Sequence, residues 1–454
     1  MNRDMNPRDL ALQVLNNLDR YPGHPAYSLE RAAQGDIRGS DRDRAFAVHL
    51  VQGVLRWRLR LDWIVQQTLQ FPFKNIRPDV LNVLRLAVYQ VFFMDRVPDS
   101  AAVNEAVKQV KRIAATHVVR SVNGILRQVC REKGNLSFPN RSPEQIRHLS
   151  VRHSYPAWLV RKWVREMGEA DAERLLIAGN RIPHLVVRTN TLKVDRPRLM
   201  VSLQKEGISA TPTNFSPEGL TLVDMQGPVD RLSSFQSGLF QVQGEAAQIC
   251  SHLLSPKPGE SILDVCSGLG GKSTHMAQLM EDRGLIVAID RNRQKLVKLG
   301  ENSRRLGIHV VKPLAGDVER ALPGLLKSSF DRIMVDGPCS ALGVISRHPD
   351  VKWNREEKDL IRLGKLQERF LNRALPLLRA GGKLLYVACT LSKEENEKVV
   401  EGFLQKNRRV RLVHLRHHAP VWVQELVDEA GFMKSLPHVH GMDGFFGALF
   451  EKRD

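Results

Sequence analysis

The chain has 454 residues, 42% of them hydrophobic, which predicts roughly two to four ordinary globular domains. It carries 68 Lys and Arg against 49 Asp and Glu, which is a net charge of +19. This excess predicts a polyanionic partner such as RNA or DNA. The alternative is that the charge serves solubility alone. No stretch approaches the roughly 18 uninterrupted apolar residues of a membrane helix, and the first residues lack an apolar signal core, so we expect a cytoplasmic protein.

Residues 1–135 are predicted to form an all-α bundle. Leu10, Ala11, Val14 and Leu15 repeat at the spacing of one buried helix face, and similar stripes follow as far as Leu126. Prolines between the stripes mark helix limits. Arginines are expected on the outside of this bundle, namely Arg56, Arg58, Arg60, Arg112, Arg120, Arg127 and Arg131.

The same region resembles the NusB family of RNA-binding helical domains. The similarity lies in Asp43-Arg44-Ala45-Phe46-Ala47, Leu50-Val51-Gln52-Gly53-Val54-Leu55-Arg56, Ala101-Ala102-Val103-Asn104-Glu105-Ala106-Val107 and Val122-Asn123-Gly124-Ile125-Leu126-Arg127. Most of these are core positions, so they identify a fold better than an activity. The resemblance implies docking to RNA or protein.

Residues 134–143 are rich in Pro, Asn and Ser and are predicted to be a linker. A small mixed α/β region is expected over 144–235, with helical sequence from Pro156 to Ala178 and then short strands. From 236 to 454, strands and helices alternate, which predicts a doubly wound, mainly parallel α/β sheet. Its expected strands are Ser261–Val265, Leu285–Asp290, His309–Val311, Arg332–Val335, Lys383–Val387 and, as a final edge strand, Phe445–Phe450.

A glycine-rich loop follows the first of these strands. Glycines there let backbone N–H groups approach a ligand at a helix N-terminus. Both NAD enzymes and S-adenosylmethionine (SAM) methyltransferases use this arrangement, and Ser273 stands where a dinucleotide fingerprint wants a third glycine, which favours SAM weakly. A tight turn without a ligand remains the alternative. The candidate cofactor-binding residues of the loop are Cys266, Ser267, Gly268, Leu269, Gly270, Gly271 and Lys272.

Carboxylates at the ends of later strands complete the predicted cofactor site. Asp290 ends the second strand, where a carboxylate can accept hydrogen bonds from a ribose diol. Asp317 could accept the adenine amino group, or could cap the turn that begins Val318-Glu319-Arg320. Asp264 lies inside a strand and is expected to hold the glycine loop through backbone N–H groups. Asp336 is placed near the reactive methyl group.

Two cysteines end two different strands, in Asp336-Gly337-Pro338-Cys339-Ser340 and Tyr386-Val387-Ala388-Cys389-Thr390. The carboxyl ends of strands are where open α/β sheets bind ligands, so a thiol at each predicts covalent chemistry rather than packing. Thiolate addition to C6 of cytosine would make C5 nucleophilic towards SAM. This needs a cation beside the thiolate, for which Lys272 and Lys393 are candidates, and an Asp336 that carries or shares a proton at N3.

Spacing alone does not say which cysteine attacks. Pro338-Cys339 is also the arrangement of DNA cytosine methyltransferases, so attack by Cys339 on DNA is a competing hypothesis. The remaining cysteines, Cys130, Cys250 and Cys266, lack such a setting. The five are odd in number and contain no C-x-x-C pair, so neither a disulfide framework nor a metal site is predicted.

Residues 185–450 resemble RNA cytosine-C5 methyltransferases, and with the NusB-like region nearly the whole chain is similar to the bacterial enzymes of that class that act on 16S ribosomal RNA. The similarity lies in Val187-Arg188-Thr189-Asn190-Thr191-Leu192-Lys193, Gly270-Gly271-Lys272, Asp336-Gly337-Pro338-Cys339-Ser340, Arg347-His348-Pro349-Asp350-Val351-Lys352-Trp353 and Asp443-Gly444-Phe445-Phe446. The resemblance implies that Cys389 is the nucleophile and that Cys339 assists product release. It also implies SAM contacts for Asp290, Asp317, Asp336 and the 266–272 loop, and it suggests that Arg347, His348 and Lys352 face RNA, unless they form a salt-bridged loop.

Some residues depart from that family's usual sequence. Where that family usually has Ala-Ala-Pro, this chain has Ser267-Gly268-Leu269. Ala388 stands in place of a threonine that commonly precedes the nucleophile, and Gly244 stands in place of an aspartate. None of these changes removes a reacting group. The leading hypothesis is a monomeric, SAM-dependent 16S rRNA methyltransferase that acts on RNA and not DNA. The alternatives are a non-catalytic RNA-binding ribosome assembly factor and an NAD-dependent oxidoreductase.

Overall fold

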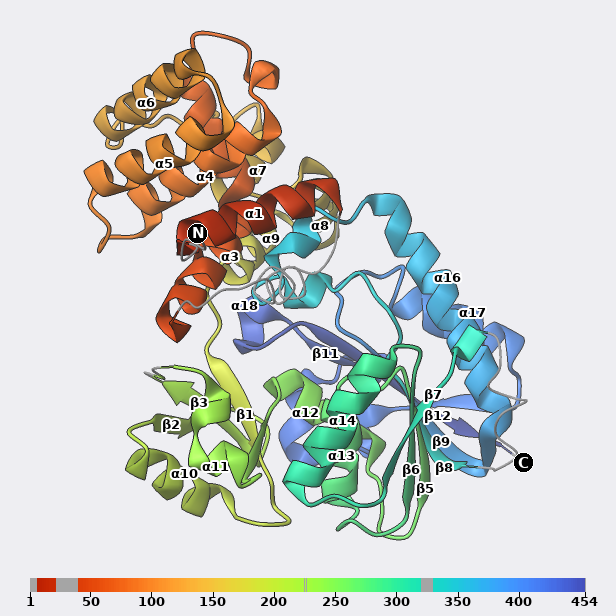
Figure 1. Cartoon of the computed structure of the whole chain (residues 1–454). Coiled ribbons are helices and arrows are strands. Elements are labelled where there is room, and N and C mark those ends of the chain that lie inside the picture. The colour runs from red at the N-terminus through yellow and green to blue at the C-terminus, as the bar shows by residue number, and fades with distance from the viewer. Residues whose placement is uncertain (1–5, 22–39, 224, 226, 320–329, 454) are drawn as a thin grey trace. The chain divides into compact units, whose positions relative to one another are not determined.

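The computed structural model describes residues 6–21, 40–223, 225, 227–319 and 330–453. The chain divides into two compact units (Figure 1): Met1–Arg181 with His348–Arg355, and Ile182–Arg347 with Glu356–Asp454. The region expected over 144–235 is therefore divided, its helices falling in unit 1 and its strands in unit 2. None of the described helices combines the length and the apolar character that crossing a membrane requires.

Unit 1 is helical, as the periodicity predicts. Its helix α4 is the centre of the bundle, because apolar residues occur all around it and α1, α3, α5 and α6 pack against it. The helices are α1 (Pro7–Arg20), α3 (Asp41–Gln67), α4 (Pro78–Phe93), α5 (Asp99–Ile113), α6 (Thr116–Arg131), α7 (Gln145–His153), α8 (Ala157–Met167) and α9 (Glu169–Gly179).

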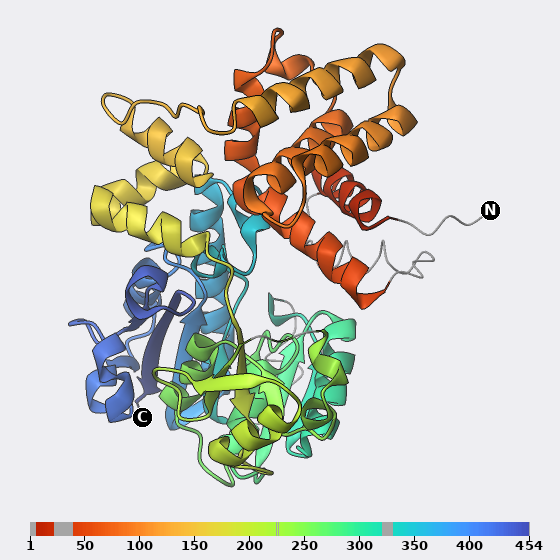
Figure 2. The same cartoon turned by 90° about the vertical axis from the view of Figure 1, so that its left-hand side faces the viewer.

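The helices α7, α8 and α9, yellow in Figure 2, form a compact group within unit 1. Gly168, with a φ of +81°, separates α8 from α9, so the helical sequence from Pro156 to Ala178 forms two helices rather than one. The expected linker before them is held in place: Trp63 Nε1 donates to the Ser137 carbonyl at 2.9 Å, and the Pro139 carbonyl lies 2.6 Å from His148 Nδ1.

One of the arginines expected outside the bundle is buried. Arg56 is 5% exposed and loss of hydration lowers its pKa, whereas Arg112, Arg120, Arg127 and Arg131 are exposed. The expectation for Arg56 was wrong because α3 is covered on that side by a segment from the far end of the chain, His348–Arg355.

That segment contains a short 3₁₀ helix, η4 (Pro349–Lys352), and corrects the expectation that Lys352 faces RNA. Lys352 is fully buried in unit 1, where its ammonium donates to the carbonyls of Arg56 and Ser154 at 2.6 and 2.8 Å and to Asn180 Oδ1 at 3.1 Å. Loss of hydration lowers the pKa of Lys352 well below its usual value. Its three N–H donors are all used by oxygen atoms of the chain, so its role here is to hold the segment in place.

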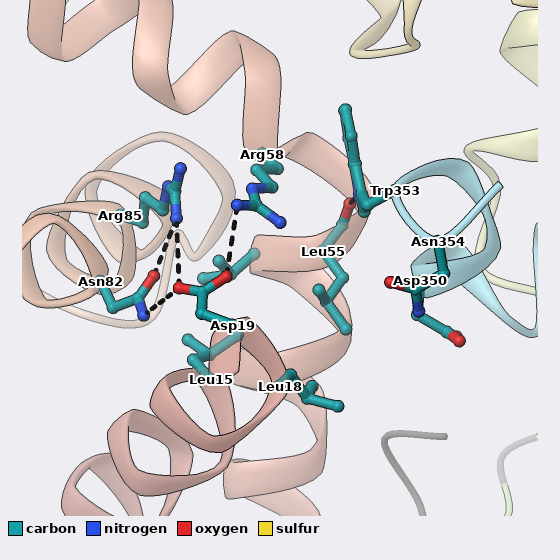
Figure 3. A pocket seen from close by; sticks show the side chains of 11 residues that line it. Leu15, Leu18, Asp19, Leu55, Arg58, Asn82, Arg85, Asp350, Trp353 and Asn354 are labelled. Atoms are coloured by element: carbon teal, nitrogen blue, oxygen red, sulfur yellow. Dashed lines mark hydrogen bonds and ion pairs between the residues drawn. The ribbon is translucent and has the colours of Figure 1, made fainter. Parts of the chain in front are cut away.

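Trp353 fixes the same segment from its other side. Its indole N–H donates to the Leu55 carbonyl at 2.6 Å, beside a pocket in which Asp19 accepts hydrogen bonds from Arg58 and Asn82 (Figure 3). In unit 2, Arg347 forms an ion pair with Asp443 at 2.7 Å, which is the salt-bridged alternative to facing RNA. His348 is half-buried.

Unit 2 begins with a four-stranded antiparallel sheet in the order β2-β3-β1-β4. Val187, Leu220, Leu222 and Phe240 on one face of this sheet pack against Leu199 and Leu203 of α10. The elements are β1 (Leu185–Thr189), α10 (Arg196–Lys205), β2 (Ser209–Pro212), β3 (Gly219–Val223), α11 (Ser233–Gln236) and β4 (Phe240–Val242).

The rest of unit 2 is the expected doubly wound sheet, in the order β10-β12-β9-β8-β5-β6-β7, with β11 pairing β12. The strands from β5 to β9 are parallel, and β10, β11 and β12 are antiparallel to their partners. The strands are β5 (Ser261–Val265), β6 (Leu285–Asp290), β7 (Val311–Ala315), β8 (Phe330–Val335), β9 (Leu378–Ala388), β10 (Val410–Val413), β11 (Met433–Ser435) and β12 (Phe445–Lys452).

Helices cover both faces of this sheet (Figure 1). Side chains alternate along each strand: Ile262 packs with α12, α13 and α14, whereas its neighbour Leu263 packs with α16 and α17. This burial on both faces explains why the central strands are mainly apolar. The helices are α12 (Glu245–Leu254), α13 (Gly271–Leu279), α14 (Arg293–Leu306), α16 (Glu357–Ala374), α17 (Glu397–Lys406) and α18 (Pro437–His440).

The prediction that Phe445–Phe450 forms an edge strand was wrong. β12 pairs with β9 on one side and with β10 and β11 on the other. Its residues Phe445 to Phe450 are all buried, which a strand with a neighbour on each side and helices over its faces requires. The third strand was also placed too early, because β7 begins at Val311.

Candidate active site

The predicted site residues lie at one edge of the parallel sheet. β5 pairs in register with β6 and β8, so Cys266, Asp290 and Asp336, which end or follow these strands, lie side by side. β7 and β9 extend the same edge and bring Asp317 and Cys389 to it. The sheet therefore gathers residues that are up to 123 positions apart in the sequence.

The loop after β5 is a tight turn anchored to β6. Cys266, Gly268 and Gly270 have φ values of +64°, +58° and +80°. The Ser267 N–H donates to the Ile289 carbonyl at 2.9 Å, and the Gly268 N–H donates to Asp290 Oδ2 at 3.0 Å. Leu269, at the tip of the turn, is 51% exposed. The turn at Gly270 leads directly into α13.

Asp290 supports the loop and can still accept hydrogen bonds from the two hydroxyl groups of a ribose. Its other oxygen, Oδ1, accepts the Asn292 N–H at 2.7 Å. Each carboxylate oxygen can accept a second hydrogen bond, so both can still receive hydroxyl groups. Asp290 is 9% exposed at the edge of the sheet.

Asp264 holds the loop differently from expectation. Its carboxylate accepts a hydrogen bond from Ser273 Oγ at 2.5 Å, on α13, rather than from the backbone of the loop. Within the described residues its Oδ1 has no hydrogen-bond partner. Burial raises the pKa of Asp264 from its usual 3.8 to about 7. Asp264 therefore ties β5 to the helix that begins at the loop.

Asp317 follows β7, next to Asp290 through the hydrogen bond from the Gly316 N–H to the Asp290 carbonyl. Its Oδ1 accepts the Glu319 N–H at 2.9 Å, which is the capping geometry that the sequence offered as one alternative. Asp317 is half-buried, so an adenine amino group is also within its chemistry. Arg320 lies outside the described residues.

Lys272 and Asp336 form an ion pair beneath the loop, with Nζ donating to Oδ2 at 2.6 Å. Burial by itself would lower the pKa of Lys272. The negative charge of the Asp336 carboxylate outweighs burial, so the pKa of Lys272 is raised, and the Cys389 sulfur also raises it. The ammonium also lies 5.3 Å from the centre of the Phe445 ring. The second candidate cation, Lys393, is exposed after β9.

The two cysteines meet at the same place, although 50 residues separate them in sequence. Cys339 Sγ and Cys389 Sγ are 3.1 Å apart, and both residues are half-buried. The hydrogen bond with Cys389 and, next, burial raise the pKa of Cys339 well above its usual value. The two sulfurs are therefore within hydrogen-bond reach of each other, and either of them can be the donor.

A buried network that the sequence did not reveal positions the two cysteine segments. Glu395, fully buried on the segment between β9 and α17, accepts the Ser340 N–H at 2.8 Å and Gln367 Nε2 at 3.2 Å. Ser340 Oγ lies 2.7 Å from Thr390 Oγ1. Burial raises the pKa of Glu395. In the sequence nothing distinguishes Glu395 from its half-buried neighbour Glu394.

The remaining cysteines do not join the pair. Cys250 lies on α12 and is fully buried in the core, and burial raises its pKa to about 12. Cys266 lies at the loop, where burial strongly raises its pKa. Cys130 is half-buried on α6. Of the five thiols, the sheet edge brings Cys339 and Cys389 together.

Known proteins match every part of this chain. Residues 251–451 match the family described as 16S rRNA methyltransferase RsmB/F, residues 5–131 match the NusB family, and residues 155–230 match the ferredoxin-like domain of RsmF/B-like methyltransferases. A Synechocystis protein named "Probable ribosomal RNA small subunit methyltransferase B" is 35% identical over 449 residues, which cover 98% of this chain and 99% of the relative.

Solved structures agree. The crystal structure of PH0851 covers 100% of both chains with a TM-score of 0.81 and 26% identity. The structure of NSun6 from Pyrococcus horikoshii with SFG covers 66% of this chain and 99% of its own, with a TM-score of 0.59 and 26% identity. With a relative of this identity over nearly its full length, the chain belongs to the ribosomal RNA small subunit methyltransferase B (RsmB) family of SAM-dependent methyltransferases.

Proposed function

We propose that this protein methylates C5 of a cytosine in 16S ribosomal RNA, with Cys389 as the nucleophile. The observation that supports this most is the 3.1 Å approach of Cys339 and Cys389 at the sheet edge that also carries the Lys272–Asp336 pair. A lone thiol there would be an ordinary small core residue. Two thiols beside an acid and an ammonium match the needs of addition to a pyrimidine.

The glycine loop fits the methyl donor. Its positive φ values form the tight turn that leads into α13, and Ser267 Oγ is a buried hydroxyl without a hydrogen-bond partner in the described part of the chain. Residues 266–272 would hold SAM, with Asp290 on the ribose hydroxyls and Asp317 on the adenine amino group. Bound there, SAM supplies an electrophilic methyl group.

The chain's own residues carry the proton and electron movements. Cys389, as the thiolate, donates its electron pair to C6 of the cytosine, and the displaced pair moves through the ring to N3. The Lys272 ammonium donates to Asp336 at 2.6 Å, and this pair would supply the proton that N3 takes up at that moment. The resulting enamine makes C5 nucleophilic. C5 would then bond to the methyl carbon while the bond from that carbon to the sulfonium sulfur breaks, and the electron pair would stay on the sulfur of the departing S-adenosylhomocysteine.

Release requires a base for the proton on C5. We assign this role to Cys339, whose sulfur lies 3.1 Å from that of Cys389: it would give its own proton to water and then accept the C5 proton. The C6–Sγ bond breaks, its electron pair returns to Cys389, and N3 gives its proton back. The net result is one methyl group transferred and one proton released.

The assignment of attack to Cys389 rather than to Cys339 rests on the family resemblance, because the two sulfurs lie 3.1 Å apart and either can donate to the other. Attack by Cys339 on DNA remains the competing hypothesis. The relatives named as ribosomal RNA methyltransferases support RNA rather than DNA as the substrate. We expect the protein to act in the cytoplasm as a monomer, on RNA that is at least partly single-stranded where the cytosine is flipped out.

Cysteine variants test the proposal. Cys389→Ala should lower methyl incorporation into undermethylated 16S rRNA by about 10⁴-fold or more, as loss of a covalent nucleophile does in other enzymes. Cys339→Ala should accumulate a protein–RNA adduct that survives denaturing electrophoresis. The measurement is incorporation of radiolabelled methyl groups by the purified full chain.

Cys130→Ala is the control, because this thiol lies in the helical unit, and it should methylate at the wild-type rate. Full turnover by Cys389→Ala would show that another residue attacks. Calorimetric titration with SAM separates the proposal from a non-catalytic assembly factor, which would give no binding at millimolar SAM.

A further inference from the structure

Three side chains that could ligate a metal lie together in unit 2, outside the candidate active site. Glu218 precedes β3, His252 lies on α12 and His275 lies on α13. One ligand atom from each falls within 4.8 Å of the others. Glu218 Oε2 is 3.0 Å from His252 Nε2 and 3.9 Å from His275 Nε2.

The cluster is buried and incomplete. His275 is fully buried, and Glu218 is 9% exposed. Buried polar atoms in proteins nearly always have a hydrogen-bond partner. Neither ring nitrogen of His275 has one among the residues that the structure describes. Among the described residues, Glu218 Oε2 comes only to 3.9 Å from its Nε2, so this imidazole is available to a ligand that also lies close to Glu218 and His252.

Two imidazoles and one carboxylate are the donor set of zinc sites with three protein ligands and one open position. Hard cations such as Mg²⁺ and Ca²⁺ prefer sets made of oxygen atoms alone. With metal–ligand bonds of about 2.0–2.2 Å, tetrahedral ligands lie about 3.4 Å from one another. The separations of 3.0 and 3.9 Å lie on either side of that value, so small rotations of the side chains would form the site.

We propose that Glu218, His252 and His275 bind one zinc ion. Further contacts position the ligands as zinc sites require. Ser216 Oγ donates to Glu218 Oε2 at 3.3 Å, and the Glu218 carbonyl is held by the Thr189 N–H and hydroxyl at 2.9 and 2.8 Å. The ring of Trp422 packs edge-on against His252 at 5.0 Å between ring centres.

The ion would act as a structural clip behind the cofactor loop. His275 is three residues after Lys272 on the helix that begins at the loop, and α12 packs directly against that helix. Zinc would join this helix to α12 and to the start of β3, so removing it should loosen the first turn of α13. This effect does not depend on the identity of the RNA substrate.

The test uses the purified full chain. After treatment with a chelator and dialysis, titration with Zn²⁺ followed by elemental analysis should give one zinc ion per chain, and the thermal midpoint should rise on zinc addition and not on Mg²⁺ addition. His252→Ala and Glu218→Gln should each lose the ion. Exposed His184→Ala is the matched control and should keep it.

The cysteine pair is another place where zinc could bind, so Cys339→Ala/Cys389→Ala must retain one ion. If His275→Ala does not fold, His252→Ala still decides the matter, because His252 is the more accessible ligand, with 13% of its side chain exposed. Wild-type protein that takes up no zinc, or an unchanged stoichiometry in His252→Ala, would overturn the proposal. The cluster would then be a Glu–His hydrogen bond beside a water.

Discussion

A single buried carboxylate, Asp264, gives unit 2 a pH dependence that runs opposite to that of most acidic residues. Burial raises its pKa from 3.8 to about 7, so the folded chain holds a proton that the unfolded chain releases between these values. The contribution of Asp264 to the free energy of unfolding is therefore complete below about pH 4 and is lost as the pH rises through 7. The Ser273 hydroxyl that donates to it limits this loss and does not remove it.

Asp264→Asn should remove the part of the pH-dependent loss that is due to Asp264 and leave the part due to Glu395, because an amide is neutral at every pH and its oxygen can still accept the Ser273 hydroxyl. At pH 8 the variant should be more stable than wild type by up to about 4 kcal/mol, since a shift of one pKa unit corresponds to about 1.4 kcal/mol. At pH 4 the two should differ little. Urea unfolding at both pH values measures this.

Asp230→Asn, at an exposed position, is the control and should leave the pH profile unchanged. Equal profiles for wild type and Asp264→Asn would mean that Asp264 is ionised in the folded protein.

At the scale of elements, the turn into α13 is the most constrained feature of the site. Gly270 has a φ of +80°, and a Cβ there would lie 2.5 Å from Leu299 Cγ on α14. Gly268 has a φ of +58°, but a Cβ there would meet nothing within 4 Å. The two glycines therefore separate the cost of the backbone conformation from the cost of crowding against α14.

Alanine at either glycine should cost about 1–2 kcal/mol for the left-handed conformation. Gly270→Ala should lose about 1–3 kcal/mol more by overpacking against Leu299. It should also weaken SAM binding more than Gly268→Ala, because α14 must move before the loop can close on a ligand. Thermal unfolding and SAM calorimetry on both variants provide the comparison. Equal losses in the two would show that crowding at Leu299 plays no part.

For the whole molecule, the net charge of +19 does not say which cations meet RNA. Lys352 lies in a motif that suggests RNA contact, yet its ammonium is buried against three oxygen atoms. Lys352→Met should leave these acceptors unpaired, at about 1–3 kcal/mol each. We expect it to destabilise unit 1 while leaving the salt dependence of RNA binding unchanged.

Exposed arginines of the helical unit provide the contrast. Changing Arg120, Arg127 and Arg131 together to Ala should reduce the slope of log affinity against log salt by about 2, at about 0.7 for each phosphate contact with single-stranded RNA. Fluorescence anisotropy at several salt concentrations measures both variants. A reduced slope in Lys352→Met would contradict the buried position of its ammonium.

Local sequence was enough for several elements. The strands expected at Ser261–Val265 and Leu285–Asp290 are β5 and β6 with those bounds, since continuous apolar runs between turn residues define buried strands. The expectation of an edge strand at Phe445–Phe450 failed, because its neighbours β10 and β11 are short and weakly patterned.

The sequence by itself determined the class of fold, the glycine loop and the presence of thiols at two strand ends, because periodicity and turn chemistry act between near neighbours in the chain. Only the tertiary structure decided that Cys339 and Cys389 lie 3.1 Å apart, that Lys352 is buried while Arg120 is exposed, and that Glu218, His252 and His275 form one cluster. These facts depend on contacts between residues far apart in sequence. Such contacts depend on packing and burial, which local sequence patterns do not predict.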